Sequence, residues 1–233
     1  NDVEANSMTL TVDNQPPTVN GITYTISDIA VTKVSYNQKV KITATFSEDM
    51  LEANVPTISL TGGTVDTTNG AAMTRSSATE YFYNYTVPPA GDGTMTASFA
   101  VGTDIAGNEV YATPDANAAE LEVDNTDPKV TLTNNPPDDR VRSADGTVEI
   151  TAVFSEPMTA DPRLSVTNGS SSGSEVLPLT FKSVDGNTYK YDWTVPDDVS
   201  NPYECVVSAV GTDVAGNDVE ANSMTLTVDN QPP

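Results

Sequence analysis

The chain has 233 residues, of which 33 are acidic and 10 are basic, and its formal net charge is −23. This excess of negative charge repels nucleic acids and anionic membrane surfaces, so we expect no nucleic-acid partner. No apolar run is long enough to cross a bilayer, so we expect no membrane insertion in this segment. Histidine is absent and Cys205 is the single cysteine, which excludes Ser–His and Cys–His nucleophile pairs and imidazole zinc sites. We therefore expect a protein that is not an enzyme.

The first predicted element is a strand that the chain contains twice. Residues 1–17 read NDVEANSMTLTVDNQPP, and residues 217–233 repeat these seventeen letters without a change, at an offset of 216 residues. Identity of this length indicates recent duplication, so we expect the protein to repeat with this period. Met8, Leu10 and Val12 alternate with polar residues, as in a strand with one buried face. Residues 1–17 are therefore predicted to be the closing strand and linker of a preceding repeat, with residues 1–12 pairing with a neighbouring repeat or another copy of the chain.

Residues 18–127 are predicted to form one complete domain, of the usual size for a single hydrophobic core. Val40, Ile42, Ala44 and Phe46 alternate with polar residues, which is typical of a half-buried strand. A second strand carries alternating tyrosines over residues 81–87. Further short strands are predicted at residues 57–60, 96–101 and 121–123, separated by turn clusters such as PPAGDG.

Residues 128–233 are predicted to form a second domain with an outgoing linker, because they repeat the first. FSEDM at residues 46–50 returns as FSEPM at 154–158, and GTDIAGN at 102–108 returns as GTDVAGN at 211–217. The tyrosine strand returns at residues 189–195 with Trp193, so this lone tryptophan is expected in the core. About seven short strands per hundred residues, without helical periodicity, predict an all-β fold of tandem immunoglobulin-like antiparallel β-sandwiches.

These motifs carry a family resemblance. FSExM at the end of the second strand, GTDxAGN after the sixth, a closing strand and then VDNxxP resemble the bacterial Ig-like tandem repeats of large cell-surface and biofilm-associated adhesins. The resemblance covers nearly the whole chain and implies an extracellular location at the cell surface. It also implies a structural role, as a stalk or spacer whose partners are neighbouring repeats. A self-assembling filament or surface-layer component built from such domains is the alternative.

Acidic motifs are predicted to gather where the chain enters each domain. In a seven-strand sandwich the loops after the second and sixth strands return to the entrance end, which should bring Glu48 close to Asp104. Asp13 and Asn14 then arrive from the preceding linker. The corresponding set in the second domain is Glu156, Asp213, Asp124, Asn125 and Asp127. Converging carboxylates repel one another unless a hard cation lies between them, and calcium takes six to eight oxygen ligands, so the sequence predicts Ca²⁺ at both junctions.

A tight turn without a metal is the alternative explanation of DxAGN. In such a turn the aspartate accepts backbone N–H groups, and glycine or asparagine adopts a positive φ. This explanation accounts for the loop but leaves Glu48 and Asp13 without a role. Cys205 lies within a predicted strand, so we expect it to be a small buried hydrophobe and not a nucleophile.

Overall fold

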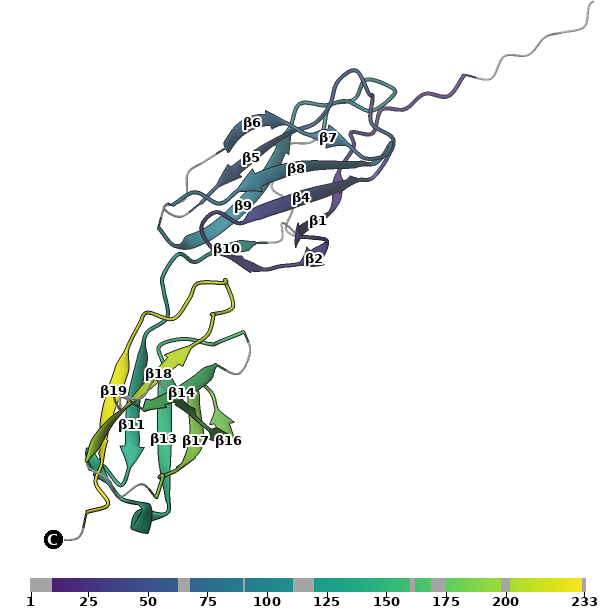
Figure 1. Cartoon of the computed structure of the whole chain (residues 1–233). Helices are drawn as coiled ribbons and strands as arrows, with labels where there is room; N and C mark the ends of the chain where they lie inside the picture. The colour runs from purple at the N-terminus through teal and green to yellow at the C-terminus, as the bar shows by residue number, and fades with distance from the viewer. Residues whose placement is uncertain are drawn as a thin grey trace, which may run out of the picture. The chain divides into compact units, whose positions relative to one another are not determined.

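The computed structural model describes residues 10–62, 68–89, 91–110, 120–159, 162–168, 175–197 and 202–231. Within these residues the regular structure consists of β-strands and one short 3-10 helix, η1 (Ser143–Asp145). The chain forms two compact units, Asn1–Asn125 and Thr126–Pro233 (Figure 1). Among the described residues, none forms a helix that is long and apolar enough to cross a membrane.

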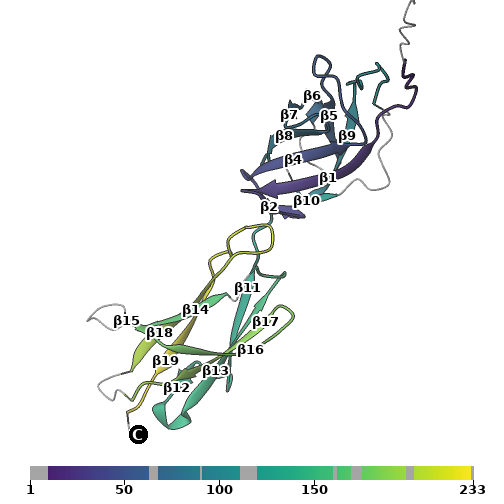
Figure 2. The same cartoon turned by 90° about the vertical axis from the view of Figure 1, so that its right-hand side faces the viewer.

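The first unit is a sandwich of two five-stranded sheets. Its strands are β1 (Val19–Ile26), β2 (Ile29–Ala30), β3 (Lys33–Val34), β4 (Lys39–Phe46), β5 (Thr57–Thr61), β6 (Thr68–Ala72), β7 (Thr74–Arg75), β8 (Glu80–Thr86), β9 (Gly93–Ala100) and β10 (Leu121–Val123). One sheet has the order β2-β1-β4-β8-β7 and the other β3-β10-β9-β5-β6. Figure 2 shows β1 and β4 lying along one another in the first of these sheets.

Strand β4 illustrates why the first sandwich forms. Val40, Ile42, Ala44 and Phe46 are buried, while the residues between them point away from the core, which confirms the predicted alternation. The neighbouring strand β8 contributes Tyr81, whose ring meets that of Phe46 edge to face with centroids 5.8 Å apart. Edge-to-face pairs of this kind add to the free energy of apolar burial.

The second unit repeats this arrangement. Its strands are β11 (Val130–Asn135), β12 (Arg140–Val141), β13 (Thr147–Phe154), β14 (Arg163–Asn168), β15 (Glu175–Leu177), β16 (Leu179–Asp185), β17 (Thr188–Thr194), β18 (Tyr203–Val210) and β19 (Ser223–Val228). The sheets have the orders β11-β13-β17-β16 and β12-β19-β18-β14-β15. Strand β13 thus corresponds to β4, β17 to β8, and β19 to β10.

The core of the second unit contains the residues that the sequence placed there. Trp193 on β17 and Cys205 on β18 are fully buried, and they belong to one cluster with Leu226 of β19. Burial raises the pKa of the Cys205 thiol to about 11, because the thiolate would lose its hydration. Cys205 is therefore a packing residue and not a reactive thiol, as predicted.

The closing strand of each unit has one parallel and one antiparallel neighbour. In the first unit β10 pairs antiparallel with β9 and parallel with β3. In the second, β19 pairs antiparallel with β18 and parallel with β12. In each unit the GTDxAGN motif precedes the closing strand in the sequence.

Candidate metal centres

The GTDIAGN loop of the first unit is a tight turn held by one aspartate. Asp104 accepts hydrogen bonds from the backbone N–H of Asn108 at 2.8 Å and from its side-chain amide at 2.8 Å. The backbone N–H of Asp104 donates to the Asn108 carbonyl at 3.0 Å, and Gly107 has a φ of 94°. A positive φ suits glycine, which has no Cβ to clash. The turn explanation of this motif is therefore correct for the loop itself.

The second unit builds the same turn from GTDVAGN. Asp213 accepts from the N–H groups of Gly216 at 2.6 Å and Asn217 at 2.8 Å, and from the Asn217 side-chain amide at 2.8 Å. Asp213 is fully buried, and its own N–H donates to the Asn217 carbonyl at 3.0 Å. Two loops about a hundred residues apart thus present an aspartate in the same way.

The FSE motif lies beside this turn and also holds the chain that enters the unit. Ser47 donates its N–H to the Thr18 carbonyl at 2.8 Å and accepts the Thr18 N–H on its hydroxyl at 2.9 Å. Met50 forms a β-bridge with Asp104, which joins the two loops. In the second unit Ser155 makes the same pair of bonds with Lys129, at 2.8 and 2.9 Å. Glu48 and Glu156, which follow these serines, are therefore fixed next to their turns.

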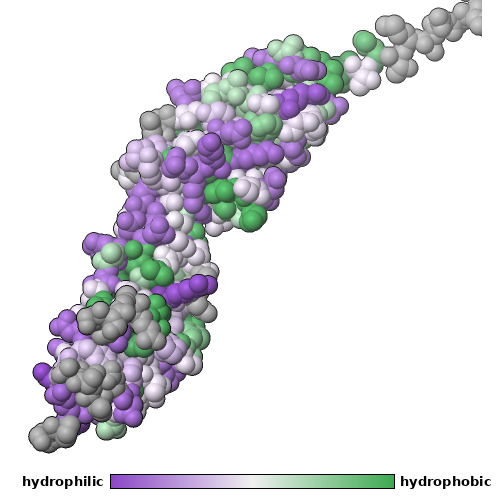
Figure 3. Space-filling view, viewed as in Figure 1, coloured by the Kyte–Doolittle hydropathy of each residue, from purple (hydrophilic) through white to green (hydrophobic). Residues whose placement is uncertain are grey.

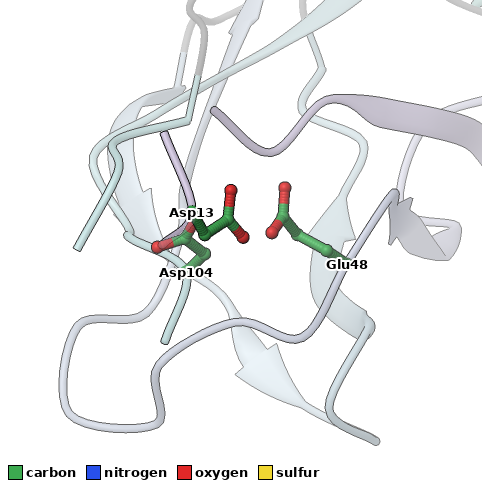
Figure 4. Close-up of side chains that lie close together, drawn as sticks. All are labelled: Asp13, Glu48 and Asp104. Atoms are coloured by element: carbon green, nitrogen blue, oxygen red, sulfur yellow. The ribbon is translucent and has the colours of Figure 1, made fainter. Parts of the chain in front are cut away.

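Asp13 completes the cluster in the first unit. Carboxylate oxygens of Asp13, Glu48 and Asp104 all lie within 4.8 Å of one another. Figure 4 shows Asp13 and Glu48 facing each other with Asp104 beside them. The side-chain amide of Asn108 donates to the Asp13 carbonyl at 3.2 Å, so one asparagine contacts both the turn and the linker.

The three acidic groups differ in their pKa. Burial alone would raise the pKa of Asp104, but hydrogen bonds from the Asn108 side chain and from backbone N–H groups outweigh it and leave the pKa lowered. The pKa of Glu48 is raised, first because its carboxyl is partly desolvated and second because Asp13 and Asp104 are negative. Among the described residues, no lysine or arginine forms an ion pair with Asp13, Glu48 or Asp104.

The donor set fits a hard divalent cation. All three side chains offer carboxylate oxygens, which are preferred ligands of Ca²⁺. Because Ca²⁺ binds oxygen at about 2.3–2.6 Å, two oxygens on one ion are at most about 5 Å apart. The carboxylate oxygens of Asp13, Glu48 and Asp104 lie within 4.8 Å of one another, which is inside that span. Three carboxylates that each give one oxygen cannot supply the six to eight ligands of Ca²⁺. Bidentate carboxylates, carbonyl oxygens or water would supply the remaining ligands.

The remaining predicted ligands have varied surroundings. In the second unit, carboxylate oxygens of Glu156 and Asp213 lie within 4.8 Å of each other. Asp124 is buried and forms an ion pair with Lys33 of the first unit at 2.8 Å, a partner that the sequence did not predict. The N–H of Asn125 donates to Asp92 at 2.7 Å. Asn14 and Asp127 are exposed.

Two positions important for the site were not among the predicted residues. Ser47 ties the entering chain to the FSE loop, and Asn108 connects the turn to Asp13. Both belong to repeated motifs, since Ser155 and Asn217 occupy the matching places. The repetition of these residues in both domains was the sequence signal that could have identified them, because a surface residue without a structural role has no reason to be kept in both copies.

Comparison with known proteins gives distant likenesses. No family model matches the sequence, and a search of curated proteins finds no match. Among solved structures, an I-band fragment from titin is 9% identical over 94% of this chain and 68% of that chain, with a TM-score of 0.45. The N-terminal part of the bacterial S-layer protein SbsC is 14% identical over 93% of this chain and 45% of that chain, with a TM-score of 0.29.

The chain is a tandem of immunoglobulin-like β-sandwiches. This assignment depends on the sheet orders and pairings of the two units and not on the distant likenesses. In each unit two sheets of mostly antiparallel strands enclose one layer of inward-facing side chains, as in immunoglobulin-like domains.

Proposed function

We propose that the chain is an extracellular structural repeat, a stalk or spacer of a cell-surface adhesin, in which Ca²⁺ stiffens the entrance of each unit. The observation that carries the calcium proposal is the cluster of Asp13, Glu48 and Asp104, which has no lysine or arginine ion partner among the described residues. Three carboxylates at this spacing destabilise the fold through mutual repulsion, and a divalent cation removes that repulsion.

The bound ion would join three parts of the first unit. Asp13 belongs to the linker, Glu48 to the FSE loop and Asp104 to the turn before the closing strand. Coordination of all three restricts the linker relative to the sandwich. A stalk needs this restriction, because a flexible linker would let neighbouring repeats fold back on one another.

The sequence repeat extends the proposal to the second unit. Asp124 and Asn125 of VDN correspond to Asp13 and Asn14, and Glu156 and Asp213 correspond to Glu48 and Asp104. Asp127 is a further candidate in this linker.

The proposal is tested by thermal unfolding of the full chain, once in chelator and once in about 10 mM calcium. This calcium concentration is about 10- to 100-fold above the Kd expected for such a site. For extracellular modules the Kd is about 0.1–1 mM, so each site should add about 1.4–2.7 kcal/mol to the free energy of unfolding. Melting temperatures should rise by several degrees and fall again after chelation. Magnesium at the same concentration should give a smaller rise, because it demands near-ideal octahedral geometry.

A matched pair of variants makes the test specific. Glu48→Gln removes a proposed ligand, and Asp49→Asn removes one charge from the neighbouring exposed position. Glu48→Gln should reduce the calcium response of the first unit, whereas Asp49→Asn should keep it. Equal responses in the two variants, or unchanged melting temperatures with and without calcium, would rule out the site.

The second candidate function is a self-assembling filament or surface-layer component. The observation that favours it is the exposure of Phe181 and Val184 on β16, the strand at the edge of the β11-β13-β17-β16 sheet. Figure 3 shows apolar patches in green on the surfaces of both units, between polar side chains in purple. Assembly in solution separates this candidate from a stalk whose units contact only their covalent neighbours.

A further inference from the structure

Strand β16 forms an open edge of the second unit. It is the last strand in the sheet order β11-β13-β17-β16, and among the described residues no strand pairs with its outer side. Figure 1 shows β16 at one side of the unit, next to β17. Phe181 and Val184 on this strand are 44% and 48% exposed. A long edge strand with exposed apolar side chains is a template for pairing with another chain.

The corresponding edge of the first unit is blunt. Strand β7 holds the matching place beside β8, and it has two residues where β16 has seven. Its side chains, Thr74 and Arg75, are both exposed. Short edge strands and charged side chains are common protections against edge pairing. Of these two matching edges, the one in the second unit is therefore open to a partner.

Two apolar residues of β16 point toward the core side of their sheet. Phe181 lies opposite Tyr191 and Val184 lies opposite Tyr189 in the pairing with β17, and both tyrosines are buried. In a regular strand, residues three positions apart point to opposite faces. Phe181 and Val184 share a face because the register shifts between residues 181 and 183, where β16 has a bulge.

The two residues between them point to the outer face. The Lys182 ammonium donates to the carboxylates of Glu149 at 2.7 Å and Asp192 at 3.2 Å. Ser183 lies opposite Lys190, which also donates to Glu149, at 2.9 Å. A lysine on an edge strand usually opposes pairing through its charge. The charge of Lys182 is balanced within its own chain, so this protection is weakened.

We propose that β16 of one chain pairs antiparallel with β16 of a second copy, with the two-fold axis between Lys182 and Ser183. Phe181 then lies opposite the partner's Val184, and Lys182 lies opposite the partner's Ser183. The faces of residues 181–184 read core, outer, outer, core in either direction, so each pair shares a face. A regular strand alternates strictly and would place side chains on the wrong face beyond the bulge. The bulge therefore favours a second copy of this strand as the partner.

The polar side chains of β16 fit the same register. Thr180 lies opposite the partner's Asp185, to which its hydroxyl can donate a hydrogen bond. Asp185 is also the diagonal neighbour of the partner's Lys182, so opposite charges meet across the two strands. The two-fold axis repeats each of these contacts. They act against the repulsion between two chains of net charge −23, which is screened over about 8 Å at physiological ionic strength.

The symmetry of this pairing limits the assembly to two chains. Each copy uses the same strand, so the contact is closed, unlike the filament considered above. The dimer is also independent of the proposed calcium sites, because none of their residues lies on β16. One pair of seven-residue strands is small beside a standard interface of about 1,600 Å². We therefore expect weak association that requires a high concentration of chains.

Sedimentation equilibrium of the full chain in chelator tests the proposal. The parent should pass from monomer to dimer as its concentration rises, without larger species. Val184→Lys removes two symmetry-related apolar pairs and should weaken the dimer by about 2- to 30-fold. Thr74→Lys on the blunt edge of the first unit changes the net charge equally and should leave dimerisation unchanged. Melting curves check that both variants keep the fold.

Disulfide cross-linking tests the register and covers the case in which Val184→Lys loses its fold. Thr180→Cys combined with Asp185→Cys should give covalent dimers under mild oxidation, because these positions face each other across the two-fold axis. Within one chain they are too far apart along the strand to form a disulfide. Thr180→Cys alone should give far fewer dimers, and Cys205 is fully buried.

Four results would each overturn the proposal. The first is a parent chain that stays monomeric at millimolar concentration, and the second is the formation of species larger than a dimer. The third is a folded Val184→Lys variant that dimerises as the parent does. The fourth is equal cross-linking of the single and the double cysteine variants.

Discussion

The entrance turns of the two units are alike in detail, whereas their cores are alike only in outline. Asp104 and Asp213 each accept the amide and side-chain N–H groups of the asparagine four positions later, at 2.8 Å in all four cases. In the cores, by contrast, Tyr85 of β8 corresponds to Trp193 of β17, and both are buried. Among the described residues, the buried side chains of the first unit form one core cluster, whereas those of the second unit form two that share Leu132, Leu164 and Leu179 at their border.

The difference follows from what each region requires of a side chain. The turn needs an acceptor and a donor at fixed positions, so few residue types can replace Asp104 or Asn108. The core needs apolar volume, and neighbouring side chains can adjust to a tyrosine or a tryptophan. Substitutions that exchange residues between the two units should therefore be mild in the core, and loss of a turn group should be equally harmful in both units.

The largest effect is expected from loss of core volume. Trp193→Ala should lower the free energy of unfolding of the second unit by about 3–5 kcal/mol, because it leaves a large cavity. Trp193→Tyr, which introduces the residue found at the matching position of the first unit, should lower it by about 1–2 kcal/mol. Chemical denaturation followed by circular dichroism measures both, since the only tryptophan is lost. Equal losses would show that the two cores are not interchangeable.

Loss of the turn aspartate should come next. Asp104→Ala and Asp213→Ala each remove the acceptor of two N–H groups of one asparagine, so we expect a loss of about 2–3 kcal/mol in either unit. Hydrogen exchange at the amides of Asn108 and Asn217 should accelerate in the altered unit alone. Asp49→Ala, at an exposed position of the neighbouring loop, should stay within about 0.5 kcal/mol of the parent.

Substitution of the first glycine of the turn motif should affect the two units differently. Gly102 has a φ of 72°, and a Cβ there would lie 2.9 Å from backbone atoms of Pro56. At Gly211 the nearest atoms to a Cβ are side-chain atoms of Pro162 at 3.1 Å and Met158 at 3.2 Å. Gly102→Ala should therefore lower the free energy of unfolding by about 1–3 kcal/mol. Gly211→Ala should cost less, about 1 kcal/mol, because Gly211 lies outside the positive-φ region and Met158 is flexible, so that only Pro162 must shift slightly. A similar loss in both would show that the loops are equivalent at this position too.

The smallest effect concerns the pH dependence of the first unit without calcium. The pKa of Glu48 is raised in the folded state, so the unfolded chain releases this proton at a lower pH than the folded chain does. The free energy of unfolding therefore falls as the pH rises from the ordinary pKa of glutamate through the raised pKa of Glu48. Glu48→Gln should remove this fall and be more stable than the parent at pH 7, by less than about 1 kcal/mol because the carboxyl is partly solvated. If Ca²⁺ binds, the order should reverse in 10 mM calcium (a concentration well above the expected Kd of about 0.1–1 mM). Melting curves at pH 4 to 8 with and without calcium measure this.

The sequence predicted the strands well because period-two patterns report directly on which face is buried. Val40, Trp193 and Cys205 lie in the core as expected. The neighbourhood of Glu48 and Asp104 followed from strand order, although calcium binding there stays a prediction. The ion pair of Lys33 with Asp124 could not be predicted, since 91 positions separate the residues and charge alone does not select a partner. The hydrogen bonds between Ser47 and Thr18 could not be predicted for a similar reason, because Ser47 bonds to backbone groups, which every residue carries.

The parallel pairing of each closing strand determines how the fold responds to tension. Strands β3 and β10 run in the same direction, yet β3 lies near the beginning of its unit and β10 near its end. When the two ends of the chain are pulled apart, such strands slide along each other and their hydrogen bonds are loaded in shear. Bonds loaded in this way share the force and must break together, whereas an antiparallel hairpin opens one bond at a time. Strands β12 and β19 repeat the arrangement, so the same loading in shear is expected of the second unit.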